Sequence, residues 1–255
     1  MCDTCGCNID HGHGHAHNHP HEHDHNHDQA PGNVDMGRQS LLNLNDRLAG
    51  DNRRLFRDKG ITVINVVSSP GAGKTALLEK TMRELGRDLK VAAIVGDLAT
   101  NHDADRLRAS GAPAHQITTG SACHLDAHMV HHALYHLDLE ALDLLFIENV
   151  GNLVCPASFD LGEDLFVVLL ATTEGEDKPL KYPVIFLKAD AVIVNKTDLA
   201  TAVDFDRTTA LAHLAEAAPK ARIFETSAKN GDGVALWCDY LRKLSVAKKR
   251  TFSPA

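Results

Sequence analysis

A glycine-rich loop between an apolar run and a helical pattern constrains the fold of this chain more than any other feature. Residues 68–75 read Ser-Ser-Pro-Gly-Ala-Gly-Lys-Thr, after the apolar run 61–68 and at the start of helical spacing over 74–85. In such a strand–loop–helix unit, the loop N–H groups and the positive end of the helix dipole face an anion. The unit therefore predicts an α/β domain that binds phosphate.

Apolar runs and helical patterns alternate along the rest of the chain. Continuously apolar strands between helices indicate a parallel sheet with both faces covered. We therefore predict an α/β fold, a doubly wound and mostly parallel sheet over residues 38–247, with tails at 1–37 and 248–255. The predicted strands are 61–68, 90–95, 114–118, 142–148, 165–171, 191–195 and 222–225, and the predicted helices include 40–59, 74–85, 124–137, 205–217 and 234–244.

Composition and charge exclude several functional classes. The formal net charge is −8, whereas a protein that coats nucleic acid carries a clustered basic excess. No run approaches the roughly 20 apolar residues that span a membrane, and the N-terminus lacks the apolar segment of a secretory signal. We therefore expect a cytoplasmic protein with reduced cysteines and with no nucleic-acid or membrane partner.

The N-terminal tail is rich in metal-binding side chains and poor in apolar ones. Cys2, Cys5 and Cys7 crowd the start, and every second residue over 11–27 is histidine. We expect such a segment to be disordered without metal, because it has little to bury. Three thiolates and the amine exposed by removal of Met1 suit Ni²⁺, although Zn²⁺ also accepts thiolates. The alternatives are oxidisable free thiols and an engineered tag, but tags usually place histidines consecutively.

The glycine-rich loop matches the phosphate-loop pattern G-x-x-x-x-G-K-[ST], except that Ser68 stands at the first glycine position. Gly71 and Gly73 still allow backbone N–H groups to turn toward phosphate. Lys74 is placed to reach the β- and γ-phosphates, and the Thr75 hydroxyl to bind Mg²⁺. The predicted nucleotide contacts in this loop are Ser69, Pro70, Gly71, Ala72, Gly73, Lys74, Thr75 and Ala76.

Two further short motifs indicate that the base is guanine. Asn195-Lys196-Thr197-Asp198 follows an apolar run and matches the N-K-x-D element of GTP-binding proteins. The Asp198 carboxylate can accept from guanine N1–H and N2–H₂, whereas adenine leaves it unpaired. Ser227-Ala228-Lys229 resembles the last guanine-contacting loop. The residues predicted to bind GTP or GDP through these motifs are Asn195, Lys196, Asp198, Ser227, Ala228 and Lys229.

Two carboxylates complete the predicted chemistry. Asp97 and Glu148 each follow or end an apolar run, and ligands collect at the carboxyl ends of parallel strands. We predict that both bind Mg²⁺ together with Thr75, and that Lys74, Asp97 and Glu148 are catalytic. The alternatives are a helix N-cap for Asp97 and a capped strand end for Glu148.

Cysteine and histidine recur inside the predicted domain. Cys123, His124 and Cys155 form a further candidate metal site, for which buried packing residues are the alternative. One predicted helix also carries histidines at i, i+4 spacing, so that neighbours in the stripe can chelate a metal. A solvated helix face is the alternative for this stripe, which comprises His124, His128, His132 and His136.

Together these motifs resemble the hydrogenase nickel-incorporation GTPases of the HypB family. The resemblance covers essentially the whole chain through CxxCGC, the histidine-rich tail, SSPGAGKT, GDLATNHDADR, ACH, ENVGNLVCP, DKPLKYP and NKTD. It implies a GTP- and metal-dependent homodimer that helps to insert nickel into [NiFe]-hydrogenase. The implied partners are a companion nickel metallochaperone and the hydrogenase large-subunit precursor. The implied metal sites are a tight nickel site at Cys2, Cys5 and Cys7 and a nickel or zinc site at Cys123, His124 and Cys155 near the dimer contact.

We therefore expect a P-loop GTPase domain with a metal-binding tail, acting as a GTP-hydrolysing nickel metallochaperone. Its turnover should be slow, because no arginine other than Arg106 is a candidate for a catalytic finger. A urease-type nickel GTPase is one rival, although it is not expected to carry both CxxCGC and Cys155. A nickel or zinc storage protein with secondary GTPase activity is the other.

Overall fold

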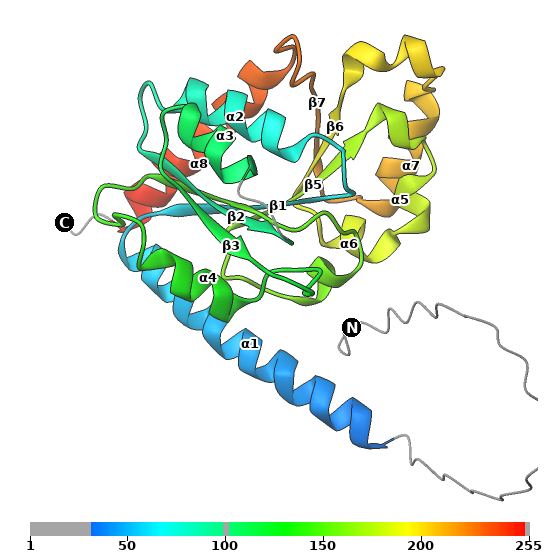
Figure 1. The fold of residues 1–255 in the computed structure, drawn as a ribbon. Helices are drawn as coiled ribbons and strands as arrows, with labels where there is room; N and C mark the ends of the chain where they lie inside the picture. Colours follow the sequence, from blue (N-terminus) through cyan, green and yellow to red (C-terminus); the bar gives the residue numbers. More distant parts are fainter. Residues whose placement is uncertain (1–31, 99–101, 253–255) are drawn as a thin grey trace, which may run out of the picture.

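Seven short strands, of which the five central ones are largely buried, form one parallel sheet in the order β3-β2-β4-β1-β5-β6-β7. The computed structural model describes residues 32–98 and 102–252, and Figure 1 shows helices on both faces of the sheet. The predicted α/β fold class is confirmed. The strands are β1 Thr62–Ser68, β2 Val91–Asp97, β3 Ala114–Thr118, β4 Leu144–Glu148, β5 Leu165–Ala171, β6 Ala191–Asn195 and β7 Arg222–Glu225. The helices are α1 Gly32–Asp58, α2 Lys74–Leu85, α3 His102–Ala109, α4 Ala127–Leu134, α5 Lys178–Lys181, α6 Pro183–Lys188, α7 Arg207–Ala217 and α8 Val234–Phe252.

The central strands are mostly apolar and buried because helices cover the sheet on both sides, whereas the edge strands β3 and β7 are partly exposed. All seven residues of β1 are buried, and successive side chains point to opposite faces. Ile64 and Val66 join a core with α2, α3 and α8, whereas Val63 joins a core with α1 and α4. A third core, on the same face as α1 and α4, packs β5 and β6 against α6 and α7. The pattern therefore specifies strands without specifying which face each helix covers.

The strand order places a ligand-binding edge at the centre of the sheet. β1 lies between β4 and β5, so β2 and β3 lie on one side of it and β6 and β7 on the other. Every strand pair is parallel, so the carboxyl ends share one edge. The loops after β1, β2 and β4 meet near the point where the order reverses, where open α/β sheets bind ligands.

Both terminal helices are longer than the apolar spacing predicts. α1 begins at Gly32, whereas the prediction placed its start at residue 40. The prediction missed the first turns because the apolar spacing on which it rested starts only at Leu41. α8 continues past residue 244 to Phe252. In this added segment, Lys248 forms an ion pair with Asp164, and Lys249 forms one with Asp143. These are tertiary contacts, so apolar spacing along the helix could not predict them. Among the described residues, no helix combines the length and apolarity needed to cross a membrane.

Helix α4 is shorter than the predicted helix 124–137, and the difference corrects the histidine stripe. The helix begins at Ala127 because the Asp126 carboxylate accepts a 2.7 Å hydrogen bond from the Met129 N–H and acts as its N-cap. His124 therefore lies in the loop before α4, and His136 lies beyond its end. The prediction that four histidines share one helix face is wrong; only His128 and His132 do so.

Candidate functional site

The loop between β1 and α2 has the backbone that a phosphate cradle requires. Gly71 and Gly73 have φ values of 75° and 98°, in the left-handed region that favours glycine. A Cβ atom on Gly73 would lie 2.7 Å from Nδ2 of Asn195, so a side chain is also excluded by contact. The glycines therefore fix the loop conformation and bring it against the loop after β6.

The serine at the first glycine position is a partner of the P-loop lysine. Ser68 is buried, and its Oγ accepts a 2.9 Å hydrogen bond from Nζ of Lys74. The same hydroxyl donates to the Ser69 carbonyl oxygen at 2.6 Å. Burial lowers the pKa of Lys74, although nearby carboxylates, Glu148 first among them, oppose the shift. A phosphate group in the loop would supply the negative charge that this buried ammonium lacks.

Glu148 and Thr75 form a buried pair at the carboxyl end of β4. The Thr75 hydroxyl donates a 2.7 Å hydrogen bond to Oε1 of Glu148. Burial raises the pKa of Glu148 to about 7, while Lys74 and the Thr75 hydrogen bond act in the opposite direction. Oε2 of Glu148 is buried with no hydrogen-bond partner among the described residues. The Thr75 hydroxyl and the Glu148 carboxylate, with its unpaired Oε2, are hard oxygen donors of the kind that Mg²⁺ prefers.

These groups face a common cavity. Its volume is about 400 Å³, and the P-loop, the end of β2 and the segment after β4 line it. Lys74, Asp97 and Glu148, predicted as catalytic, all lie in this lining. The lining also contains Asp103, which sequence reasoning missed although it lies six residues after Asp97 in GDLATNHDADR. Arg106 lines the cavity as well, and its guanidinium donates a 3.1 Å hydrogen bond to Glu79.

Asn195 joins the phosphate loop to the loops after β6 and β7. Its Nδ2 donates to the Ala72 carbonyl oxygen at 3.0 Å. Its Oδ1 accepts from the Thr226 hydroxyl and from the Ala228 N–H, both at 3.1 Å. Because Asn195 is fully buried, these bonds set the spacing between the phosphate loop and the loops after β6 and β7, which carry the predicted base-recognition motifs.

The remaining residues of the N-K-x-D element stand beside this junction. Lys196 has φ 59° and donates through Nζ to the Gly71 carbonyl oxygen at 2.7 Å. Asp198 is exposed, and its Oδ1 accepts a 2.5 Å hydrogen bond from the Ser227 hydroxyl. Lys229 is exposed in the loop after β7. The structure therefore brings the two predicted base-recognition motifs together and leaves Asp198 exposed.

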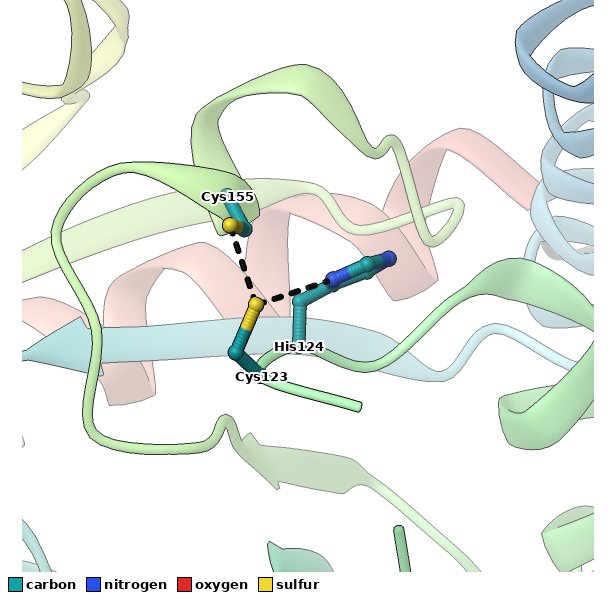
Figure 2. Close-up of side chains that lie close together, drawn as sticks. All are labelled: Cys123, His124 and Cys155. Carbon is teal, nitrogen blue, oxygen red and sulfur yellow. Dashed lines mark hydrogen bonds between the residues drawn. The ribbon is translucent and has the colours of Figure 1, made fainter. Parts of the chain in front are cut away.

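A second constellation lies on the loops after β3 and β4, and Figure 2 shows its three side chains converging. Sγ of Cys123 lies 3.0 Å from Sγ of Cys155 and 3.8 Å from Nδ1 of His124. The ligand atoms of the three residues all lie within 4.8 Å of one another. Thiolate and imidazole suit Zn²⁺, Ni²⁺ and similar ions, and three protein ligands leave a tetrahedral or square-planar ion one open position.

The surroundings of His124 are compatible with the predicted role of this residue as a metal ligand. The side chain is buried and stacks on Phe159 with ring centroids 3.8 Å apart. Burial lowers the pKa of His124, although Asp126 opposes the shift. The stacking holds the imidazole in one orientation, and burial favours the neutral form, which is the form that binds metals.

The segment between Glu148 and Cys155 contacts both constellations. A Cβ atom on Gly151 would lie 3.0 Å from Cα of Pro70, so this segment lies directly against the phosphate loop. Further along, Nδ2 of Asn152 donates to the Cys123 carbonyl oxygen at 3.2 Å. One short segment therefore links the cavity to the cysteine pair. The other predicted ligands, Cys2, Cys5, Cys7 and the tail histidines, lie outside the described residues.

Comparisons with known proteins agree with this geometry. The model of the CobW/HypB/UreG nucleotide-binding domain matches residues 62–225. The hydrogenase maturation factor HypB of Azotobacter vinelandii is 52% identical over 205 residues, which cover 80% of this chain and 68% of that protein. The crystal structure of hydrogenase maturation factor HypB from Archaeoglobus fulgidus superposes with a TM-score of 0.74 at 43% identity, covering 79% of this chain and 98% of that one. The crystal structure of HypB from Helicobacter pylori in complex with nickel superposes with a TM-score of 0.76 at 41% identity, covering 83% of this chain and 98% of that one.

Proposed function

The chain belongs to the HypB family of hydrogenase maturation factors, within the CobW/HypB/UreG group, and from that premise we propose that it is a GTP-hydrolysing nickel metallochaperone. It would help to insert nickel into a [NiFe]-hydrogenase precursor in the cytoplasm. The observation that carries the proposal is the segment from Glu148 to Cys155, which contacts the phosphate loop at Pro70 and the cysteine pair at Cys123.

The nucleotide part of the proposal follows from the cavity and the loops beside it. The phosphate-loop amides and Lys74 would bind the phosphates, and Asp198 with Ser227 would recognise guanine. Thr75, Asp97 and Glu148 would hold Mg²⁺, which would neutralise charge that develops on the phosphates. Lys74 would leave Ser68 for the γ-phosphate, because a charged acceptor forms the stronger hydrogen bond.

Nucleotide state would control the metal through the segment from Glu148 to Cys155. Glu148 contacts Thr75 in the cavity, and Cys155 lies seven residues further along the chain. A shift of this segment on loss of the γ-phosphate would move Sγ of Cys155 relative to Cys123 and His124. Binding linkage is reciprocal, so metal must change GTP affinity by the factor by which GTP changes metal affinity.

The open coordination position favours a homodimer. Cys123, His124 and Cys155 provide three ligands, and a two-fold axis near them would supply the same three residues from a second copy. We propose a GTP- and metal-dependent homodimer that passes Ni²⁺, or Zn²⁺ in its place, to a companion metallochaperone or to the hydrogenase precursor. Residues 1–37 would collect metal, with Cys2, Cys5 and Cys7 as the tight site.

The test measures metal affinity of the domain site with GDP and with a non-hydrolysable GTP analogue. The full chain with Cys2, Cys5 and Cys7 replaced by alanine is titrated with Ni²⁺, and thiolate-to-nickel charge-transfer absorption is recorded. The histidine tail does not contribute to this signal. We expect affinities that differ by about 5- to 150-fold between the two nucleotides, the usual range of allosteric coupling.

Two variants of that background separate coupling from structural damage. Cys155→Ala should weaken metal binding at the domain site and erase the coupling, while GTP affinity without metal stays nearly unchanged. Cys238→Ala is the matched control, because Cys238 is a buried cysteine of α8 that belongs neither to the cavity lining nor to the group of Cys123, His124 and Cys155. Equal affinities with the two nucleotides would leave a static site of the kind expected for a storage protein.

A further inference from the structure

A second group of histidines gathers on the surface beside β3, and the proposed function does not use it. His115, His128, His132 and His136 line a pocket of about 400 Å³. They come from three places in the chain: β3, helix α4 and the turn after α4. Figure 1 shows α4 lying along the sheet near β3. The tertiary fold therefore adds His115, which no helical spacing predicted.

The first pair has a spacing that binds metals on helices. His128 and His132 are four residues apart on α4, and both are exposed. Their ring centroids lie 4.5 Å apart with an interplanar angle of 70°. Two histidines at i, i+4 on one helix face can hold the same ion, as in helical zinc sites. The helix thus sets two imidazoles close together without any contribution from a loop.

The second pair is formed by contact between the strand and the turn. His115 and His136 stack with ring centroids 4.1 Å apart and planes only 4° from parallel. This contact places one imidazole from the strand and one from the turn at the same point of the pocket. Burial first, and then His136 and Arg108, lower the pKa of His115.

Nearby charge does not prevent a cation from binding. Arg108 is a cation whose charge acts on His115. The Arg108 guanidinium forms an ion pair with Asp105 at 2.6 Å. Nε of Arg108 also donates to the Ala114 carbonyl oxygen, which holds the side chain in place. The other pocket residues are uncharged: Gln116, Ile117, Met129, Ala133 and Tyr135.

We propose that His128 and His132, with His115 and His136, bind one divalent transition-metal ion of the Ni²⁺ or Zn²⁺ class in an imidazole-only site. Among the described residues, only Cys123, His124 and Cys155 already hold three ligand atoms within 4.8 Å, so binding here requires the exposed imidazoles to rotate. The site lacks thiolate, so its affinity should be lower than that of the cysteine sites. It needs no nucleotide and goes beyond the proposed function.

The test uses the full chain and reads each histidine separately. The protein is treated with diethyl pyrocarbonate at a chelator-buffered free Ni²⁺ concentration, or Zn²⁺ in parallel samples, and modification is located by peptide mass spectrometry. Chelator buffering fixes free metal whatever the tail binds. At free metal about ten times the dissociation constant, the unoccupied fraction falls about tenfold, and modification of His128 and His132 should slow by the same factor.

Two variants complete the experiment. His128→Ala/His132→Ala should bind one metal equivalent fewer than the unaltered chain and lose protection at His115 and His136. His131→Ala is the matched control on the same helix, because the His131 ring nitrogens already contact Asn52 and Tyr135. The site is supported if Ni²⁺ or Zn²⁺ slows histidine modification in the unaltered chain and in His131→Ala but not in the double variant. Unchanged modification rates with both ions, or equal metal stoichiometry in both variants, would overturn it.

Discussion

Sγ of Cys155 lies 3.0 Å from Sγ of Cys123, although the two residues are 32 positions apart and follow different strands. Cys155 lies at the end of a segment that begins at Glu148. The Glu148 carboxylate accepts a hydrogen bond from the Thr75 hydroxyl in the cavity. A metal held by the cysteines and a phosphate held by the loop would therefore act on the same short segment. This arrangement gives the proposed exchange between nucleotide and metal a physical route.

Lys74 should be required for hydrolysis. Basal turnover should be slow, about 10⁻⁴ to 10⁻² s⁻¹, because Arg106 in the cavity is paired with Glu79 and is not poised as a finger. Lys74→Ala should abolish it by removing the phosphate contact, as measured by phosphate release under single-turnover conditions. Lys80→Ala, on the same helix, should keep the basal rate. A basal rate above about 1 s⁻¹ would show that a catalytic group has been missed.

Asp198 should determine base specificity. Its carboxylate is exposed and oriented by the Ser227 hydroxyl, so it can accept from the guanine edge. Asp198→Asn should weaken GTP binding by about 5- to 150-fold, equivalent to about 1–3 kcal/mol for unpaired polar groups, and favour xanthosine triphosphate. Equilibrium binding of labelled nucleotides checks this, with Asp204→Asn as control at another exposed position. Equal affinities of the unaltered protein for ATP and GTP would contradict the assignment.

Stability without nucleotide should fall as pH rises through the range in which Glu148 ionises. Burial raises the pKa of Glu148 from 4.5 to about 7, so the folded state holds this proton more tightly than the unfolded state does. Stability is therefore lost between about pH 4.5 and 7, by up to about 3 kcal/mol at about 1.4 kcal/mol per pH unit.

Glu148→Gln removes this ionisation. The variant should gain stability relative to the unaltered chain as pH rises from 5 to 8, as measured by urea unfolding without nucleotide or Mg²⁺. Glu216→Gln, at an exposed position on α7, is the control and should show no such change. A difference between Glu148→Gln and the unaltered chain that stays constant over this pH range would refute the raised pKa.

The terminal cysteines should provide the tightest nickel site of the full chain. Cys2→Ala/Cys5→Ala/Cys7→Ala should remove one tight equivalent and leave weaker binding by the histidine tail. Affinity should weaken as pH falls, because the thiols must lose protons to bind. Competition against a coloured chelator at pH 6 and pH 8 measures both effects. A tight equivalent that survives the triple substitution would place the site elsewhere.

The amino-acid sequence by itself determined the strands, the fold class and the nucleotide motifs. Runs such as 165–171 and 191–194 are apolar at every position, and SSPGAGKT and NKTD carry their chemistry within a few consecutive residues. Such signals are local: they depend on periodicity, on glycine at left-handed positions and on fixed spacing. The seven predicted strands all occur, and both ends of each lie within two residues of the predicted ends.

Only the tertiary structure decided which distant residues meet. Cys123 and Cys155 could be packing residues by spacing, and their contact depends on how two loops after non-adjacent strands pack together. His115 joins α4 histidines through strand–helix packing, while Asp126 ends the predicted stripe by capping α4. The distances between side chains on different loops depend on the order of the strands and on how the helices pack on both faces of the sheet. Local sequence patterns do not encode these distances.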